Sequence, residues 1–390
     1  MRDEAKIVTG EAFGLLPLAL LIQPEDKLHN QQVSMTQSNG KIRVLIADDS
    51  ALMRRELRKL LEADRAFEVV DTARDGQEAV AKTHQYQPDV VALDINMPVM
   101  DGLTALQLIM MESPRPVVMI SSLTQEGAFS SYEALELGAV DFIGKPGGTI
   151  SKNLSHISFD IVMKLKAAAE ARVKNVRIRR TAQRRETTAK RMTSTSKGRG
   201  KIIVIGESTG GPNTIMDIIP AFPADLAAAV VIIQHMPANF TPSFANRLDQ
   251  YCAIPFKEAA PGDVITPGQG YLAPGDVNMV LVPRGNGKPG EMVRLTNTPD
   301  TLHKPSVNVA MESALKLYGA NMIGVLLTGM GDDGANAMVA VREAGGRTIA
   351  ESEETCVVFG MPREAIARGG AEFVLPAHKI GEKIVELAKA

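Results

Sequence analysis

The sequence predicts an α/β protein with two domains, each built on a sheet of mainly parallel strands. Its 390 residues exceed what one hydrophobic core usually supports. From Lys41 onward, short apolar runs alternate with amphipathic segments, and a second series of this kind opens at Lys201. Strands that are apolar throughout are buried on both faces, which is typical of parallel sheets covered by helices.

The first domain is expected over residues 41–160 as a flavodoxin-like sheet of five strands alternating with five helices. The predicted strands are Ile42–Ala47, Phe67–Thr72, Val90–Asp94, Pro116–Ser121 and Asp141–Gly144. The predicted helices are Ala51–Glu62, Gln77–His84, Leu103–Met111, Phe129–Leu137 and Ile157–Ala171. Such sheets bind ligands at the carboxyl ends of their strands.

The second domain is expected over residues 201–390, doubly wound and mostly parallel, with an antiparallel hairpin. The predicted strands are Lys201–Ile205, Ala229–Ile233 and Ile323–Leu327, and the predicted helices are Pro212–Ile219, Ser306–Leu317 and Ala335–Ala344. The stretch Pro255–Leu295 is rich in Gly and Pro and predicts turns and hairpins.

Two other segments are predicted to lie outside the domains. Residues 1–40 are expected to be a disordered extension, because the apolar run Phe13–Ile22 is interrupted by Pro17 and is too short to cross a membrane. Residues 161–200 are predicted to be a basic linker, helical at its start. Its positive charge favours solubility and spacing, with docking to an acidic partner as the alternative.

The composition excludes some classes of protein. A net charge of −2 argues against a general nucleic-acid binder. The two cysteines, Cys252 and Cys356, lie far apart without metal-like spacing, which indicates a reducing compartment.

Three carboxylates are predicted to meet at one edge of the first sheet. Asp48 and Asp49 end the first strand and Asp94 ends the third. Such carboxylates repel one another unless a cation lies among them, so a hard divalent metal, Mg²⁺, is expected. Ser121 and Lys145 end the fourth and fifth strands, where a hydroxyl and an ammonium group can contact a phosphoryl group on Asp94.

A possible nucleophile lies in the second domain. Ser208 falls in Gly206-Glu207-Ser208-Thr209-Gly210-Gly211, a turn between a strand and a helix that Pro212 can start. A hydroxyl near a helix N-terminus favours developing negative charge. A phosphate-binding turn would have a similar sequence.

A base and an acid follow strands that end on the same edge as Ser208. His235 follows one strand, and the pair Asp332-Asp333 follows another, so the sequence alone leaves the choice of acid open. With Ser208 they supply the three groups of a serine hydrolase. His303 is the rival histidine and a possible substrate contact.

Residues 41–160 resemble the receiver domain of bacterial response regulators, because the acid pair, the central Asp, the hydroxyl and the Lys-Pro arrive in order at strand ends. The resemblance implies that Asp94 is the phosphoacceptor and that Asp49, Asp94 and the Asn96 carbonyl ligate Mg²⁺ beside Asp48. It also implies that Phe142 is the aromatic side chain that responds to phosphorylation.

The whole chain from about residue 41 resembles the CheB family of chemotaxis protein-glutamate methylesterases. The segments that carry this resemblance are Ser208–Gly211, Gln234–Pro237 and Leu327–Gly331. It implies the triad Ser208, His235 and Asp333, an oxyanion donor at the Met330 backbone N–H, and a pocket shaped by Thr209. The catalytic domain would need no cofactor.

The family also implies a substrate and partners. They are glutamate methyl esters on chemoreceptors, with receptor glutamines as possible further substrates, and a chemotaxis histidine kinase as phosphodonor. Recruitment to receptor arrays in the cytoplasm is expected, and the receiver would block the active site until Asp94 is phosphorylated.

Two residues depart from the family pattern. Glu207 stands where a small residue is common, and a carboxylate there is expected to raise the pKa of the histidine or to change access for acidic substrates. Asn96 stands where Glu is frequent, although a carbonyl contact to the metal would survive.

The alternative function is a response regulator whose output is binding. DNA binding needs a recognition helix, which the strand-rich second domain does not offer. The second version of this alternative is a protein that binds a protein partner and whose Ser-His-Asp triad has no catalytic activity.

Overall fold

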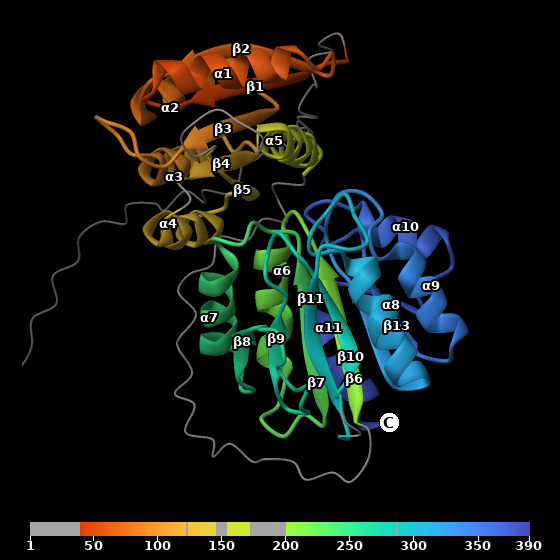
Figure 1. Cartoon of the computed structure of the whole chain (residues 1–390). Coiled ribbons are helices and arrows are strands. Elements are labelled where there is room, and N and C mark those ends of the chain that lie inside the picture. Colours follow the sequence, from red (N-terminus) through yellow and green to blue (C-terminus); the bar gives the residue numbers. More distant parts are fainter. Residues whose placement is uncertain (1–39, 122–123, 146–153, 172–199, 286–287) are drawn as a thin grey trace, which may run out of the picture. The chain divides into compact units, whose positions relative to one another are not determined.

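A computed structural model describes residues 40–121, 124–145, 154–171, 200–285 and 288–390 (Figure 1). The predicted extension at 1–40 therefore lies outside the described residues except for Gly40, and most of the predicted linker lies outside them too. Residues 41–390 form one compact unit. No helix in the described part of the chain is long and apolar enough to span a membrane.

The first domain is a five-stranded parallel sheet in the order β2-β1-β3-β4-β5. Its strands are β1 Ile42–Ala47, β2 Phe67–Ala73, β3 Val90–Asp94, β4 Val117–Ser121 and β5 Asp141–Gly144. Its helices are α1 Ala51–Glu62, α2 Gly76–Tyr86, α3 Gly102–Glu112, α4 Gln125–Glu136 and α5 Leu154–Ala169. The predicted strand and helix order is confirmed, and α4 begins four residues before its predicted start.

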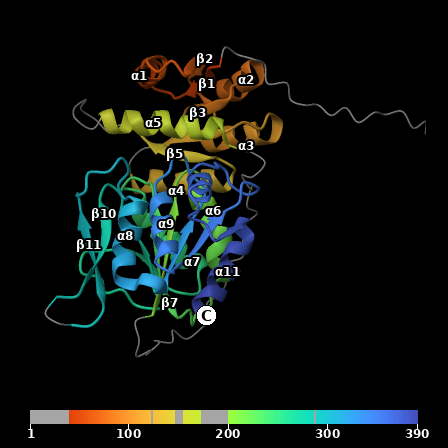
Figure 2. The same cartoon turned by 90° about the vertical axis from the view of Figure 1, so that its right-hand side faces the viewer.

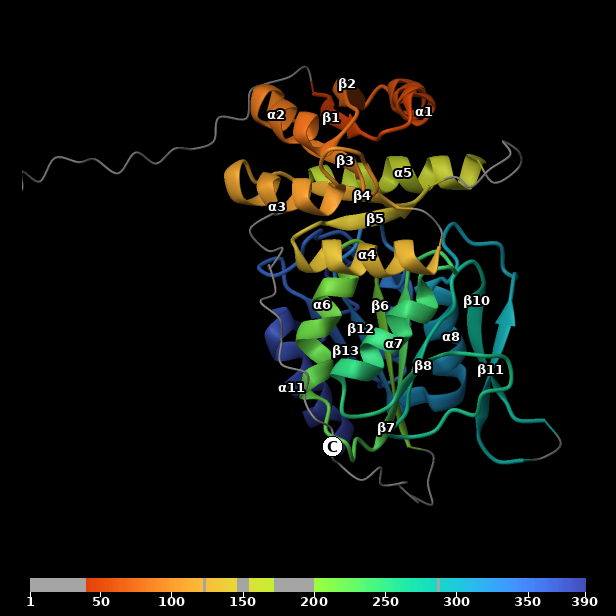
Figure 3. The same cartoon turned by 90° about the vertical axis from the view of Figure 1, so that its left-hand side faces the viewer.

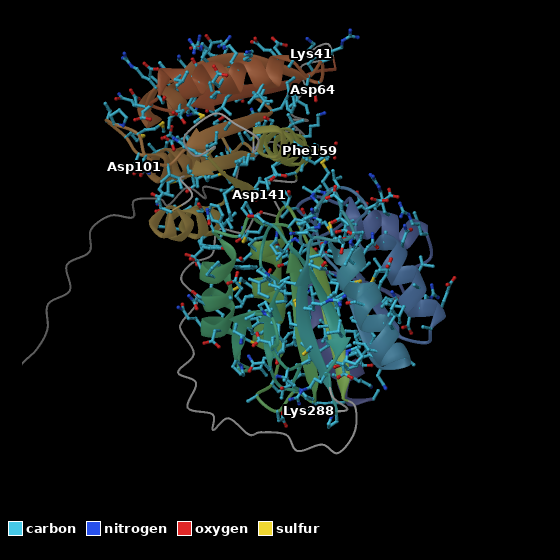
Figure 4. All side chains as sticks on the ribbon, viewed as in Figure 1. Lys41, Asp64, Asp101, Asp141, Phe159 and Lys288 are labelled. Carbon is cyan, nitrogen blue, oxygen red and sulfur yellow. The ribbon has the colours of Figure 1, made fainter. Side chains whose placement is uncertain are left out.

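Polar side chains at the helix starts explain these boundaries. Ser50, Asp75, Asp101 and Thr124 each accept a hydrogen bond from a backbone N–H of the first turn of α1, α2, α3 or α4. Asp101 lies at the start of α3 in Figure 4, which also labels Asp141 at the start of β5. Asp141 pairs with Lys164 of α5 at 2.9 Å, which holds this helix against the sheet.

The second domain is a seven-stranded parallel sheet in the order β14-β13-β12-β6-β7-β9-β8, with a separate antiparallel pair β10-β11. Its strands are β6 Lys201–Glu207, β7 Ala228–Gln234, β8 Phe256–Glu258, β9 Gly270–Leu272, β10 Asn278–Pro283, β11 Glu291–Thr296, β12 Met322–Leu326, β13 Arg347–Glu351 and β14 Phe373–Leu375. Its α-helices are α6 Gly211–Ile218, α7 Thr241–Tyr251, α8 Val307–Tyr318, α9 Ala335–Glu343, α10 Met361–Ala367 and α11 Ala377–Lys389.

Helices cover both faces of this sheet. Alternate residues of β6 enter two different cores: Ile203 and Ile205 pack with residues of α6, α7 and α11, whereas Ile202 and Val204 pack with residues of α8 and α9. Figure 2 shows α8 and α9 on one side, and Figure 3 shows α6, α7 and α11 on the other. The doubly wound prediction is confirmed.

The stretch Pro255–Leu295 was only partly predicted. β10 and β11 form the expected hairpin, but β8 and β9 join the parallel sheet instead of forming hairpins. Each has three residues, too few for a pattern to show which partner the strand takes.

Helix α4 of the first domain contacts α6 and α7 of the second. Asn213 Nδ2 donates to the Leu135 carbonyl at 3.0 Å, and the Tyr132 hydroxyl donates to the Phe240 carbonyl at 2.9 Å. Arg247 of α7 forms an ion pair with Glu136. Phe142 packs against Phe240, with 4.5 Å between ring centroids.

Candidate active site and acidic cluster

Ser208 lies directly after β6 in a tightly packed turn. Its backbone N–H donates to the Thr328 carbonyl at 3.0 Å, which joins the turn to the loop after β12. Gly210 has a φ of +83°, and a Cβ there would lie 2.6 Å from Cβ of Val357, so both the conformation and the space require glycine. The turn leads into α6 at Gly211, which leaves Ser208 half-buried near a helix N-terminus.

His235 lies directly after β7, the neighbour of β6 in the sheet. Its backbone N–H donates to the Glu207 carbonyl at 3.1 Å, so the pairing of the two strands continues up to the nucleophile turn. The buried imidazole contacts Asp333 through Nε2, with 2.9 Å between Nε2 and Oδ2. Nδ1 has no hydrogen-bond partner among the described residues, and this nitrogen is available to accept a proton.

Asp333 is held by the start of α8. Its Oδ1 accepts from the Ser306 hydroxyl and the Asn308 backbone N–H, both at 3.0 Å, and Oδ2 accepts from the Val307 backbone N–H at 2.7 Å. Burial alone would raise the pKa of Asp333, but the hydrogen bonds from His235 and from these backbone groups lower it to about 2. Asp333 is therefore an anion that orients the imidazole.

The neighbouring Asp332 points to a different partner, since it pairs with Arg368 at 2.6 Å. The acid that contacts His235 in the structure is thus Asp333, as the family resemblance implied.

His303 stacks on His235, with 4.2 Å between ring centroids and 17° between ring planes. Burial and the neighbouring His235 lower the pKa of His303 to about 3, although Asp333 acts in the opposite direction. A neutral imidazole over the ring of His235 is a wall of the site and a poor base at neutral pH.

The loop Gly329–Met330 lies against the nucleophile. A Cβ at Gly329 would lie 2.7 Å from Cβ of Ser208, so the loop approaches Ser208 as closely as a glycine allows. A cavity of about 380 Å³ lies beside this loop, with Met330, Val358 and Arg363 in its lining. Thr209 is buried, and its carbonyl accepts from the Thr328 hydroxyl at 3.0 Å.

The three carboxylates of the first domain meet as predicted. Asp48, Asp49 and Asp94 each place an oxygen within 4.8 Å of the others. Lys145 lies 3.0 Å from Asp48 and 2.8 Å from Asp94. Burial raises the pKa of Asp94, which Lys145 partly offsets. Three hard oxygen donors in this spacing fit Mg²⁺.

Two other predicted residues of this site lie nearby. Asn96 is exposed, and its backbone N–H lowers the pKa of Asp94. The buried Ser121 hydroxyl donates to the Gly127 carbonyl of α4 at 2.9 Å, which links the fourth strand to that helix. Sequence reasoning missed Arg54, whose guanidinium donates to the carbonyls of Asp48 and Asp49 at 2.7 and 2.9 Å.

The expectation that Glu207 changes access for acidic substrates is wrong. Its side chain is 0% exposed, so it does not face a substrate. Successive side chains of a strand point to opposite faces of the sheet. Glu207 therefore points to the same face as Ile203 and Ile205, which lie in a buried core.

Sequence reasoning also missed two residues that support the site. Ser306 was noted only as the start of a helix, and its side chain both caps α8 and binds Asp333. Gln234 was noted only as part of a motif, and its Nε2 donates to the Ser208 carbonyl at 3.1 Å and the His235 carbonyl at 3.0 Å. A signal for the first was Ser306 in a capping position after Pro305.

Two known protein families match parts of this chain. Residues 203–384 match the CheB methylesterase family, and residues 44–153 match the response regulator receiver domain. A protein-glutamate methylesterase/protein-glutamine glutaminase of Caldanaerobacter subterraneus is 52% identical over 354 residues, 89% of this chain and 96% of that protein. Protein-glutamate methylesterase/protein-glutamine glutaminase 2 of Carboxydothermus hydrogenoformans is 51% identical over 355 residues, 90% of this chain and 100% of that protein. The crystal structure of the Thermotoga maritima CheB methylesterase catalytic domain is 43% identical and covers 49% of this chain and 100% of that chain, with a TM-score of 0.47.

Proposed function

The chain belongs to the CheB family of chemotaxis methylesterases with a receiver domain, and we propose that phosphorylation switches its esterase activity on. The substrates are glutamate methyl esters on chemoreceptors, which are hydrolysed to glutamate and methanol. Glutamine side chains of the receptors are deamidated through the same kind of tetrahedral intermediate, as the names of the two relatives indicate for those proteins.

The hydrogen bond between His235 and Asp333 carries the proposed mechanism. Because Nε2 of His235 contacts the Asp333 anion, Nε2 carries the proton and Nδ1 is the basic nitrogen. Nδ1 takes the hydroxyl proton as Ser208 attacks the ester carbonyl, and then delivers it to the leaving methoxide. Water deacylates the enzyme by the same route in reverse.

The oxyanion of the intermediate is stabilised by the Met330 backbone N–H, which lies in the loop packed against Ser208. The start of α6 at Gly211 adds the positive end of a helix dipole. Thr209 shapes the adjoining pocket.

The first domain is proposed to control this site through Asp94. Asp48, Asp49 and Asp94, with the Asn96 carbonyl, would hold Mg²⁺, which neutralises charge when the phosphoryl group is transferred. Lys145 contacts Asp94 and is placed to pair with a phosphoryl oxygen. A chemotaxis histidine kinase is the phosphodonor, and the enzyme acts in the cytoplasm at receptor arrays.

Inhibition before phosphorylation is supported by the contacts of α4. Tyr132 and Phe142 of the first domain both contact Phe240, five residues after His235. A change in the first domain at Asp94 would therefore act on the segment that follows the base. Phosphorylation shifts the population toward an arrangement that admits the receptor.

The test is methanol release from methylated receptor membranes by the full chain, with and without a small-molecule phosphodonor and Mg²⁺. We expect release to rise with phosphodonor, to disappear in Ser208→Ala, and to lose its stimulation in Asp94→Asn. No release from any form despite phosphorylation of Asp94 would favour a binding output instead.

A further inference from the structure

Glu207, directly before the nucleophile, is a carboxyl group that the proposed mechanism does not use. It is 0% exposed, and neither of its side-chain oxygens has a hydrogen-bond partner among the described residues. An ionised carboxylate in this environment would lose its hydration without compensation, which costs several kcal/mol or more. The residue therefore needs either a proton or a partner.

The charges around Glu207 favour the proton. Burial and the negative charge of Glu351, at the end of β13, raise the pKa of Glu207 well above its ordinary value. Burial also raises the pKa of Glu351 to about 7, and Asp217 of α6 acts in the same direction. No cation acts on Glu207 among the groups that the structure describes. These surroundings favour the neutral acid, which has one O–H donor.

Gln234 stands opposite Glu207 in the pairing of β6 and β7. Its Nε2 donates to the carbonyls of both Ser208 and His235, so one amide group ties the nucleophile turn to the base. The buried Oε1 of the same amide has no partner among the described residues. One side chain therefore has an unused donor and its neighbour across the strands has an unused acceptor.

Gly211 lies against both of these side chains. A Cβ built on Gly211 would lie 2.4 Å from Oε1 of Gln234, 2.8 Å from Cβ of Glu207 and 3.0 Å from Cγ of Glu207. Both side chains therefore border one small space beneath the first turn of α6. A substitution at Gly211 would push them apart.

We propose that Glu207 is a positioning residue: as a neutral acid it donates a hydrogen bond to Oε1 of Gln234 and so fixes the amide that holds Ser208 and His235 together. Fixing this amide keeps Ser208 and His235 in the geometry that proton transfer requires. Loss of the proton at alkaline pH replaces the donor with a buried charge facing a carbonyl oxygen, which releases the amide. This inference rests on the proposed hydrolase chemistry of Ser208.

The test compares two variants in the full chain. Glu207→Gln keeps a neutral donor, whereas Glu207→Met keeps the length of the side chain and removes the donor. Glu291→Gln is the matched control, since Glu291 is also buried but lies in β11 and accepts from Tyr318 at 3.0 Å. The readouts are kcat and KM for methanol release between neutral and alkaline pH, and the rate at which phenylmethylsulfonyl fluoride labels Ser208.

We expect Glu207→Met to lower kcat and the labelling rate about tenfold at neutral pH, the effect of losing one buried hydrogen bond, with KM changed less than about twofold. Glu207→Gln should restore the neutral values and remove the alkaline decline in kcat and labelling rate that the wild type and Glu291→Gln show. A folded Glu207→Met variant with wild-type rates would overturn the inference, as would a Glu207→Gln variant that is as slow as Glu207→Met.

An infrared measurement supports the test if Glu207→Met does not fold. The wild type and Glu291→Gln should show at neutral pH a C=O band of a protonated carboxyl group that Glu207→Gln lacks. Glu351, whose pKa is about 7, also contributes to this region, so equal bands in the wild type and Glu207→Gln would overturn the inference. Failure of the proposed function is distinguishable, because it would abolish methanol release while the labelling rates and the infrared band still follow Glu207.

Discussion

At the scale of single residues, the site depends on how one carboxylate is held. Asp333 accepts four hydrogen bonds, from His235, Ser306, Val307 and Asn308. His235 and the two backbone N–H groups keep its pKa at about 2 despite burial. The carboxylate is therefore ionised at every pH at which the enzyme would act. A fixed anion selects the tautomer of His235 that leaves Nδ1 free to act as a base.

Asp333→Asn is expected to lower kcat by about 10⁴-fold at neutral pH, because an amide no longer selects that tautomer. The measurement is methanol release with phosphodonor present. Asp332→Asn is the matched control, and it should stay within about twofold of wild type because Asp332 pairs with Arg368 on the surface. A larger loss of kcat in the Asp332 variant than in the Asp333 variant would mean that Asp332 is the acid and that the assignment to Asp333 is wrong.

His303 should make the free energy of unfolding decrease as the pH falls below about 6.5. Its pKa of about 3 in the folded state lies below the value of about 6.5 in an unfolded chain, so the unfolded state binds the extra proton between these limits. The stabilisation is complete above about pH 6.5 and is lost as the pH falls toward 3, by up to about 1.4 kcal/mol per pH unit. His303→Gln should therefore show a smaller drop in melting temperature between pH 7 and pH 5 than wild type. His378→Gln, at the start of α11, is the control, and an equal drop in all three proteins would contradict the expectation.

At the scale of elements, the start of α8 serves both folding and chemistry. The Ser306 hydroxyl accepts from the Val309 backbone N–H as a helix cap and donates to Asp333. The next two backbone N–H groups also donate to Asp333, so the first turn of α8 holds the carboxylate that contacts His235. The same contacts therefore do two things. They satisfy the free N–H groups at the start of the helix, and they hold the carboxylate that faces His235.

Ser306→Ala should lower the free energy of unfolding by about 1 kcal/mol through loss of the cap. It should also lower kcat, because Asp333 loses one of its donors. Ser313→Ala removes a hydroxyl from the same helix that bonds to Leu281 and Ala310, away from the site. The two variants compared in chemical denaturation and in methanol release should differ in kcat even where they are equally destabilised. Equal kcat values would mean that Ser306 acts only as a cap.

The sequence predicts most of the elements and few of the contacts between them. Runs such as Ile202–Ile205 and Val230–Ile233 indicate buried strands, and the end of each such strand places a candidate functional residue at one edge of the sheet. That is why the sequence predicts that Ser208, His235 and Asp333 lie at one edge of the sheet. The four bonds to Asp333 were not, because they depend on where α8 packs. The burial of Glu207 was not predicted either, because a carboxylate at a strand end is usually exposed.

At the scale of the whole molecule, the contacts of α4 connect the acidic cluster with the active site. Ser121, which ends β4, donates to Gly127 of α4, and Tyr132 of the same helix donates to the Phe240 carbonyl. The Phe142 ring of β5 packs on both Phe240 and Tyr132. Rearrangement of β4 and β5 around a phosphoryl group on Asp94 would thus reach the segment that follows His235.

Tyr132→Phe tests this connection because it removes only the hydroxyl that bonds to Phe240. If the unphosphorylated first domain restrains the active site through this contact, the variant should raise methanol release without phosphodonor about three- to tenfold, the range expected for one hydrogen bond. Stimulation by phosphodonor should shrink by the same factor, since the phosphorylated form has already given up the contact. Tyr86→Phe, in α2 beside Asp71, is the matched control and should keep both rates at wild-type values. Unchanged basal release in Tyr132→Phe, together with full stimulation, would place the restraint elsewhere on α4, with the Arg247–Glu136 ion pair as the next contact to remove.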